Sequence, residues 1–215
     1  VPIVTTKISG LASDDLLLAV SDGQVLSDAD EASYRAVAKR LESLCHVAAQ
    51  NGVQLYIDAE ESWIQPAIDK VVNNAMLRYN KDRAVVCSTY QLYRHDRYEA
   101  LVAQHAICRS CGVVLGAKLV RGAYMEKEND RAKEKGYVSP ICKSKAETDD
   151  NFNATIEYMI NHLDTLSIFA GTHNEESCYR LMQLMEDNGV DKNNTHIWLV
   201  LLYGMSDHIS TTDLL

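Results

Sequence analysis

The segment VVLGAKLVRGAY, residues 113–124, has the composition of a buried strand that ends in polar residues. A short continuous apolar run is typical of a strand in a parallel sheet covered on both faces. Because side chains alternate along a strand, Lys118 is expected on the face opposite to Leu119 and Arg121. A lysine inside an apolar strand is costly unless it is paired or used, so we expect Lys118 to have a partner or a chemical role.

Strand-like and helix-like segments alternate on both sides of this segment. Short apolar or β-branched runs predict six strands, at residues 4–11, 53–58, 84–90, 113–120, 166–171 and 196–202. Amphipathic spacing and end signals predict five helices, at about residues 34–48, from Pro66 onward, and at residues 96–110, 148–163 and 175–188.

The segments between these elements are assigned less regular structure. Residues 12–29 are acidic and are predicted to be a loop or insertion, after which Asp28 or Asp30 is a candidate helix cap. Residues 126–135 carry both charge signs and are predicted to be a solvated helix face or a loop.

Strands that alternate with helices imply parallel pairing and right-handed crossovers. A doubly wound sheet would be expected to carry a GxGxxG turn after its first strand, and the residues after Leu11 do not contain one. The sequence therefore favours an α/β fold of the (β/α)8 TIM-barrel type, incomplete, with about six of the eight strands. We expect a single barrel domain over residues 1–215, truncated at both ends.

Composition excludes several classes of protein. The chain is 47% hydrophobic and 24% charged, which is typical of a globular domain. Its net charge of −9, with no concentrated basic face, argues against nucleic-acid binding. No apolar run reaches the roughly 20 residues of a membrane helix. Six scattered cysteines favour a reducing compartment, and a single CxxC at residues 108–111 without an HExxH motif predicts no metal site.

The start of the chain carries no recognisable targeting signal. Residue 1 is Val1, and no charged leader with an apolar stretch follows it. We expect a processed chain or an internal fragment.

Polar residues cluster after the predicted strands, where a barrel places its functional groups. Asp58, at the end of a buried strand, is suited to orienting a cationic group or acting as a base, but Asp58 or Glu61 equally suits a helix cap. Gly122 and Ala123 let backbone N–H groups next to Arg121 approach an anion, as in a phosphate cradle, whereas the alternative is a solvated arginine.

A third polar group, residues 172–174, follows the strand at 166–171. Its side chains suit contacts to a polyhydroxylated or phosphorylated ligand. Alternatively, Thr172 or Asn174 caps the helix that begins at Glu175.

Taken in order, six motifs resemble the eukaryotic type of the proline dehydrogenase family. They are TKISGL at 6–11, DAEE at 58–61, STYQ at 88–91, GAKLVRGAYM at 116–125, THNE at 172–175 and LLYGMSD at 201–207. The resemblance implies a barrel that holds FAD and oxidises L-proline to 1-pyrroline-5-carboxylate. In this reaction a hydride passes from proline C5 to flavin N5, and the electrons continue to a quinone. L-Proline and hydroxyproline both remain open as substrates.

The resemblance also implies residue roles. Asp58 and Lys118 match catalytic positions, Lys7 matches a residue that pairs with the substrate carboxylate, and Tyr124 matches one that packs on the substrate. The positions that match FAD contacts are Ala59, Ser88, Arg121, Gly122, Ala123, Thr148, His173 and Asn174.

The same resemblance implies a mitochondrial location on the matrix side of the inner membrane, with peripheral membrane association. The chain departs from the family at Ser88, where Gln or Asn is usual, and at Leu201, where Gln is usual. It also lacks the last strands and the helix with an ArgArg pair. Two alternatives therefore stand beside the dehydrogenase. One is an inactive fragment or non-catalytic relative that binds FAD weakly or only associates with partners, and the other is a barrel lyase using Lys118 or Lys7 as a Schiff-base amine.

Overall fold

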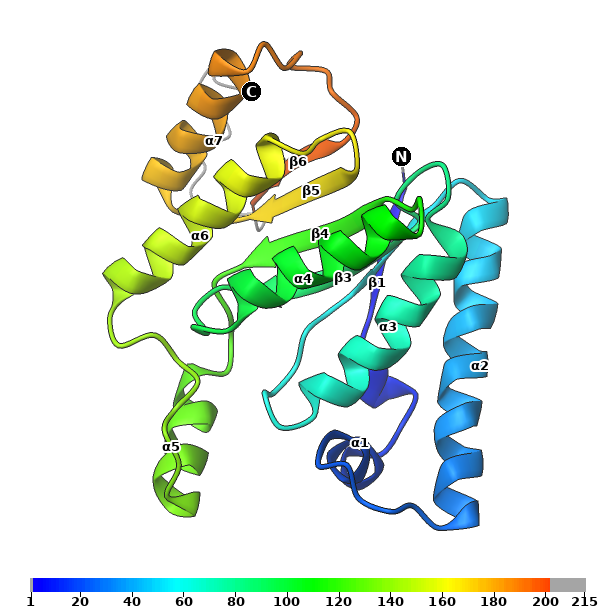
Figure 1. The fold of residues 1–215 in the computed structure, drawn as a ribbon. Coiled ribbons are helices and arrows are strands. Elements are labelled where there is room, and N and C mark those ends of the chain that lie inside the picture. The colour runs from blue at the N-terminus through cyan, green and yellow to red at the C-terminus, as the bar shows by residue number, and fades with distance from the viewer. Residues whose placement is uncertain (1, 202–215) are drawn as a thin grey trace.

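Six parallel strands form one curved sheet in the computed structural model, which describes residues 2–201 (Figure 1). The strands are β1 (Ile3–Thr6), β2 (Gln54–Ile57), β3 (Val86–Gln91), β4 (Leu115–Val120), β5 (Leu166–Gly171) and β6 (Ile197–Val200). The helices are α1 (Asp14–Ser21), α2 (Asp28–Gln50), α3 (Gln65–Tyr79), α4 (Arg97–Ser110), α5 (Met125–Lys135), α6 (Lys145–Ile160) and α7 (Glu175–Asp187). A short 3-10 turn, η1 (Ile8–Gly10), follows β1.

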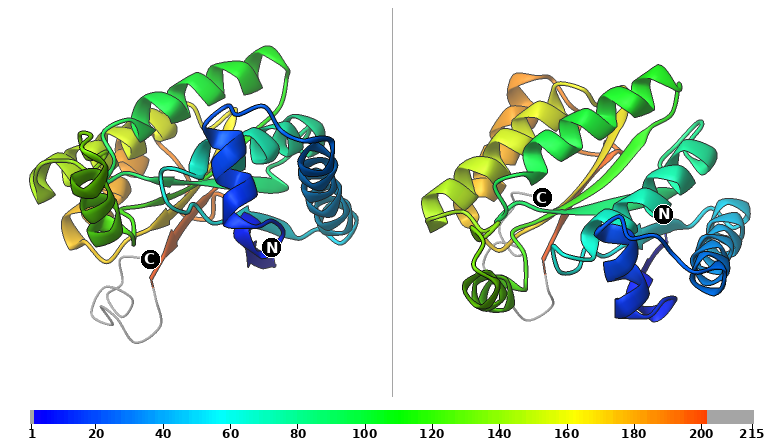
Figure 2. Two further views of the ribbon diagram at one scale, coloured as in Figure 1. Left: turned by 90° about the horizontal axis from the view of Figure 1, so that it is seen from below. Right: turned by 60° about the horizontal axis from the view of Figure 1, so that its bottom comes forward.

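The strand order identifies the architecture. Neighbouring strands are consecutive in the chain, from β1 to β6, with no reversal of order. A doubly wound sheet reverses its order at a switch point, whereas a barrel does not. The larger helices lie along the outer side of the curved sheet, while α1 and α5 lie beyond the carboxyl ends of β1 and β4 (Figures 1 and 2). The prediction of an incomplete α/β barrel with six strands is confirmed.

The two faces of the sheet bury different sets of side chains. The outer face packs against the helices in one large apolar cluster, which includes Leu55 of β2 and Leu119 of β4. The inner face holds a smaller cluster around Tyr56, Cys87 and Phe169, with the rings of Tyr56 and Phe169 4.8 Å apart. Because the side-chain period of a strand is two, β2, β3 and β5 each supply alternate residues to the two clusters.

Gly116 allows β3 and β4 to approach closely on the inner face. It is paired in register with Cys87. A Cβ atom at residue 116 would lie 2.5 Å from Cys87 Sγ and 2.8 Å from the backbone oxygen of Val86. The space beside Gly116 is therefore already filled by the neighbouring strand.

Asn80 joins the amino-terminal ends of β3 and β4. Its Oδ1 accepts hydrogen bonds from the N–H groups of Val85 (3.0 Å) and Val86 (2.8 Å). Its Nδ2 donates to the backbone oxygens of Val86 (2.7 Å) and Val114 (2.9 Å). A fully buried side chain thus satisfies backbone groups that the parallel ladder leaves unpaired.

Some predicted boundaries are wrong near the N-terminus. The strand expected at residues 4–11 ends at Thr6, because the N–H of Leu11 donates to the oxygen of Ile8 and closes a 3-10 turn. Residues 12–29 are not a loop. They contain α1, whose N-cap Ser13 accepts from the N–H of Leu16 and whose Leu16 and Leu17 side chains are buried.

The cap predictions also need correction. The hydroxyl of Ser27, and not Asp28 or Asp30, caps α2. Helix α3 begins after Ile64 without a side-chain cap, so neither Asp58 nor Glu61 serves that role. Residues 126–135, for which a helix or a loop was expected, lie in the helix α5. The strand expected at 196–202 is β6, and its last expected residue, Leu202, lies outside the described residues.

Between residues 2 and 201, none of the helices combines the length and the apolar character needed to cross a bilayer.

We expect Gly116→Ala to lower the free energy of unfolding by about 1–3 kcal/mol, the usual cost of overpacking a filled interior. Gly10→Ala is the matched control, because a Cβ at residue 10 would meet nothing within 4 Å. Urea unfolding of the two variants and the wild type measures the difference. Equal midpoints for Gly116→Ala and Gly10→Ala would show that the contact between β3 and β4 is not tight.

Candidate active site

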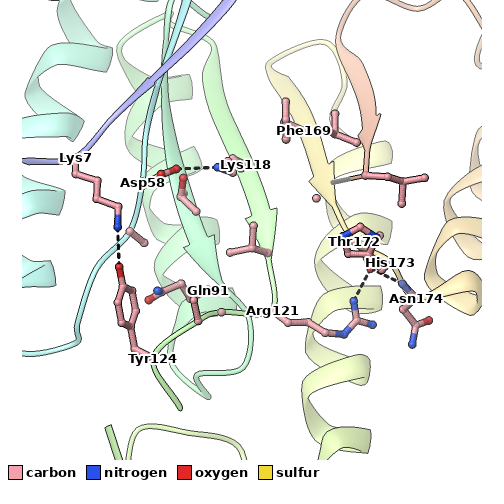
Figure 3. A pocket seen from close by; sticks show the side chains of 18 of the residues that line it. Lys7, Asp58, Gln91, Lys118, Arg121, Tyr124, Phe169, Thr172, His173 and Asn174 are labelled. Carbon is pink, nitrogen blue, oxygen red and sulfur yellow. Dashed lines mark hydrogen bonds and ion pairs between the residues drawn. The ribbon is translucent and has the colours of Figure 1, made fainter. Parts of the chain in front are cut away.

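A cleft of about 690 Å³ lies at the carboxyl ends of the strands (Figure 3). Its size is in the range of small-molecule binding sites, and its position is the one at which barrels bind ligands. Ten of the twelve predicted site residues line it: Lys7, Asp58, Ala59, Lys118, Arg121, Gly122, Ala123, Tyr124, His173 and Asn174. Thr89, Gln91, Lys145 and Phe169 are among its other lining residues.

The lining is cationic in a chain that is acidic overall. Its basic side chains are Lys7, Lys118, Arg121 and Lys145, whereas among residues 2–201 Asp58 is its single carboxylate. The whole chain carries a net charge of −9. Clefts lined by one sign of charge concentrate ligands of the opposite sign, so this cleft suits an anionic ligand.

Lys118 and Asp58 form an ion pair on the inner face of the sheet. The Lys118 Nζ lies 2.7 Å from Asp58 Oδ1, and both side chains are mostly shielded from solvent. The ammonium group also lies 5.8 Å from the centre of the Phe169 ring. Lys118, in the apolar strand β4, is therefore paired with Asp58, which follows β2. This ion pair offsets the free energy that burying an unpaired ammonium group would cost.

Lys7 and Tyr124 meet from two other elements. Lys7 follows β1 and donates from Nζ to the Tyr124 hydroxyl at 3.1 Å, as Figure 3 shows. This hydrogen bond is the main reason that the pKa of Lys7 lies above its ordinary value, and partial burial opposes it. Lys7 is therefore protonated over the physiological pH range.

Gly122 makes the turn that brings Tyr124 to the cleft. Its φ of 139° is in a region that side chains rarely adopt, and a Cβ there would lie 2.3 Å from Cε1 of Tyr93. The Tyr93 hydroxyl accepts a hydrogen bond from the N–H of Tyr124 at 3.2 Å. Gly122 thus lets the chain pass over the Tyr93 ring on its way from β4 into α5.

Arg121 is held by several side chains and is not a solvated arginine. It donates to Asp149 Oδ1 (2.8 Å), to the hydroxyl of Thr172 (2.7 Å) and to that of Ser177 (3.0 Å). Its guanidinium carbon lies 4.6 Å from the centre of the Phe152 ring. Strand β4 therefore presents Arg121 in a fixed orientation.

The carboxylate beside Arg121 is kept ionised. Burial raises the pKa of Asp149, but hydrogen bonds from Lys145 and Arg121 outweigh burial, so its pKa lies below the ordinary value. The charged pair of Asp149 and Arg121 is therefore maintained at neutral pH.

The third polar group borders the cleft at the start of α7. The side chain of Asn174 caps this helix by accepting from the N–H of Ser177 at 2.9 Å, which confirms one of the two cap candidates. Thr172 instead accepts from Arg121 and from the N–H of Asn174. The amino-terminal end of a helix carries a partial positive charge, which adds to the cationic character of the cleft.

Two predicted site residues do not line the cleft. Ser88 is buried and alternates with Thr89 and Gln91, which do line it, so Ser88 lies on the other face of β3. Thr148 lies within α6 and donates to the backbone oxygen of Ser144 at 3.3 Å.

Gln91 lines the cleft, although the motif comparison, which included it in STYQ at 88–91, assigned it no role. It is 3% exposed, and within residues 2–201 its Oε1 accepts no hydrogen bond. An unpaired buried amide oxygen is costly, and a ligand N–H in the cleft would satisfy it. Side chains two residues apart on a strand share a face, so Gln91 lies on the same face of β3 as Thr89, which is paired in register with Lys118. This alternation was the sequence signal that could have identified Gln91.

Comparisons with known proteins identify relatives of this chain. The family model described as "Proline dehydrogenase" matches residues 2–213. The chain is 33% identical over 199 residues to "Proline dehydrogenase 1, mitochondrial" of Caenorhabditis elegans, covering 87% of this chain and 31% of that protein. It is 34% identical over 211 residues to "Carbapenem antibiotics biosynthesis protein CarD" of Pectobacterium carotovorum subsp. carotovorum, covering 97% of this chain and 53% of that protein.

The fold is also that of a solved structure. Proline utilization A from Bdellovibrio bacteriovorus superposes with a TM-score of 0.83 at 21% identity, covering 96% of this chain and 20% of that one. The chain thus spans about a third to a half of the length of the two curated relatives described above. A family model that matches almost every residue shows that the chain belongs to the proline dehydrogenase family.

Proposed function

We propose that this chain forms the greater part of the active site of a flavin-dependent proline dehydrogenase, which oxidises L-proline to 1-pyrroline-5-carboxylate and passes the electrons to a quinone. The observation that carries the proposal is the cationic cleft at the carboxyl ends of the strands, which holds the Lys118–Asp58 pair in an acidic chain of this family.

Lys7 is the proposed partner of the substrate carboxylate. It is cationic, lies at the end of β1, and among the described residues its hydrogen-bond acceptor is the neutral hydroxyl of Tyr124. A carboxylate would form a stronger, charge-assisted hydrogen bond with this ammonium group. The ring of Tyr124 then supplies an apolar surface for the pyrrolidine ring of the substrate.

The residues present fit FAD. Gln91 offers an unpaired acceptor for the imide N–H of the flavin ring. Arg121, whose orientation is fixed, and the neighbouring Gly122 and Ala123 line the cleft and are the proposed contacts of the pyrophosphate. His173 and Asn174, at the start of α7, are the proposed contacts of the remaining part of the dinucleotide.

FAD, when bound, supplies the acceptor for a hydride from proline C5. The protein supplies orientation and charge. Lys118 is held by Asp58, so its positive charge has a fixed place on the wall of the cleft, where negative charge on the reduced cofactor would be stabilised. Ala59 is a further proposed contact of the cofactor.

The departure at Ser88 does not weaken the proposal. Ser88 lies on the face of β3 away from the cleft, and Gln91 provides an amide on the cleft side. A lyase with a Schiff-base lysine would need an unprotonated amine, whereas the pKa of Lys7 is raised and Lys118 is in an ion pair.

The cellular setting is part of the proposal. Some of the relatives are named as mitochondrial proteins. We propose a mitochondrial location on the matrix side of the inner membrane, with peripheral association that gives access to the quinone.

We expect the purified full-length protein to show visible flavin absorption bands that bleach when L-proline is added without oxygen. The measurement is an anaerobic absorbance titration with D-proline as the control ligand. Absence of bound flavin, even after incubation with excess FAD, would favour the non-catalytic alternative.

We expect Lys118→Met to slow flavin reduction by proline by about 10²-fold or more, as removal of a fixed charge at a reaction centre does. Stopped-flow absorbance measures this rate. Arg180→Met is a matched control, since it removes the exposed ion pair with Glu157 on the outer surface. Equal rates in Lys118→Met and Arg180→Met would remove Lys118 from the catalytic site.

A further inference from the structure

We infer that Glu128 is a positioning residue, whose buried carboxylate fastens α5 to the segment after β2 and thereby holds Tyr124 across the cleft from Lys7. The expected effect of Glu128 on catalysis rests on the proposed function. The structural part of the inference stands on contacts outside the cleft, because neither Glu128 nor its partner Ser62 is a lining residue.

Glu128 is fully buried although it belongs to a helix rich in charged residues. One of its oxygens accepts from the backbone N–H of Ser62 at 2.6 Å, and the other accepts from the Ser62 hydroxyl at 2.6 Å. A buried carboxylate is costly unless it is well hydrogen-bonded. Both bonds go to one residue, so the compensation depends on α5 and the segment after β2 staying together.

Two further contacts join α5 to residues 61–63, one on each side of the pair formed by Glu128 and Ser62. The ammonium group of Lys127 lies 2.8 Å from Glu61, and the guanidinium group of Arg131 lies 4.4 Å from the centre of the Trp63 ring. The Lys127 side chain is 67% exposed, so solvent screens its ion pair. The pair of Glu128 and Ser62 between them is the buried one.

Tyr124 lies one helical turn before Glu128. The N–H of Glu128 donates to the backbone oxygen of Tyr124 at 2.9 Å, and the N–H of Tyr124 donates to Tyr93. A shift of α5 away from Ser62 would therefore move Tyr124 and break its contact with Lys7.

The same segment also fixes the residues beside Lys7. Glu60, which is 4% exposed, accepts from the N–H of Ser9 at 3.0 Å and from the Ser9 hydroxyl. Ser9 is two residues beyond Lys7. Residues 58–62 thus contact Lys118 through Asp58, the turn after β1 through Glu60, and α5 through Ser62.

The test compares Glu128→Ala, Glu128→Gln and Ser62→Ala in the full-length protein, with Lys133→Ala, at an exposed position of the same helix, as a control. Hydrogen–deuterium exchange followed by mass spectrometry reports on residues 121–131. We expect Glu128→Ala to speed amide exchange there by about tenfold or more, because two hydrogen bonds to a charged acceptor are lost. Exchange in β3 and α3 is expected to stay unchanged.

The smaller changes should have graded effects. Glu128→Gln keeps an acceptor for the Ser62 N–H, so we expect it to restore most of the protection. Ser62→Ala keeps the backbone bond and should be intermediate. Lys133→Ala should resemble the wild type.

Kinetics give the second readout. We expect Glu128→Ala to raise the KM for L-proline by about tenfold with little change in kcat, because Tyr124 and Lys7 bind the substrate in the ground state and transition state alike. Glu128→Gln should recover a KM near that of the wild type.

Each outcome decides between the explanations. Faster exchange throughout the chain, or unchanged exchange at residues 121–131, would overturn the positioning role. A local increase in a protein whose wild type does not oxidise proline would leave the link between Glu128 and α5 intact and would refute the proposed function instead.

Discussion

All six strands run parallel, and this constraint determines both the packing and the site. Parallel strands need crossover helices, so one face of every strand must be apolar to pack against them. The other face points inward and meets the inner faces of its neighbours, where space is limited enough that residue 116 must be glycine. Since all the carboxyl ends lie at one rim, polar residues that are far apart in the chain become neighbours there.

The lining of the cleft at this rim carries a net positive charge, whereas the whole chain carries a net charge of −9. Lys118 reaches the rim from β4 and is balanced by Asp58 from β2, which makes a lysine in an apolar strand tolerable. Arg121 is balanced by Asp149 on α6. Lys7 is held by a neutral phenol instead of a carboxylate. The cleft therefore keeps one cation paired with a neutral partner, and this cation is suited to an incoming anion.

The periodicity of the sequence predicted the sheet and the principal helices because their apolar faces repeat over many residues. Helix α1 was missed because it is short and lies in an acidic, glycine-containing stretch, where its cap Ser13 is the main signal. Motif comparison predicted most of the residues that line the cleft, but within the STYQ motif it assigned a role to Ser88, whereas alternation along β3 places Gln91 on the cleft side. The bonds of Asn80 and Glu128 join segments that are distant in sequence, and no local pattern specifies such partners.

The thiol of Cys87, which fills the space beside Gly116, lies on the inner face of the sheet, where its reactivity matters. Burial raises its pKa to about 12, although a hydrogen bond with Tyr56 lowers it slightly. Peroxides and electrophiles attack thiolates in preference to thiols, and access is also required. The sulfur atom of Cys87 is fully buried and its pKa is raised, so it is a poor target for such reagents and can serve as a packing atom on the inner face of the sheet beneath the cleft.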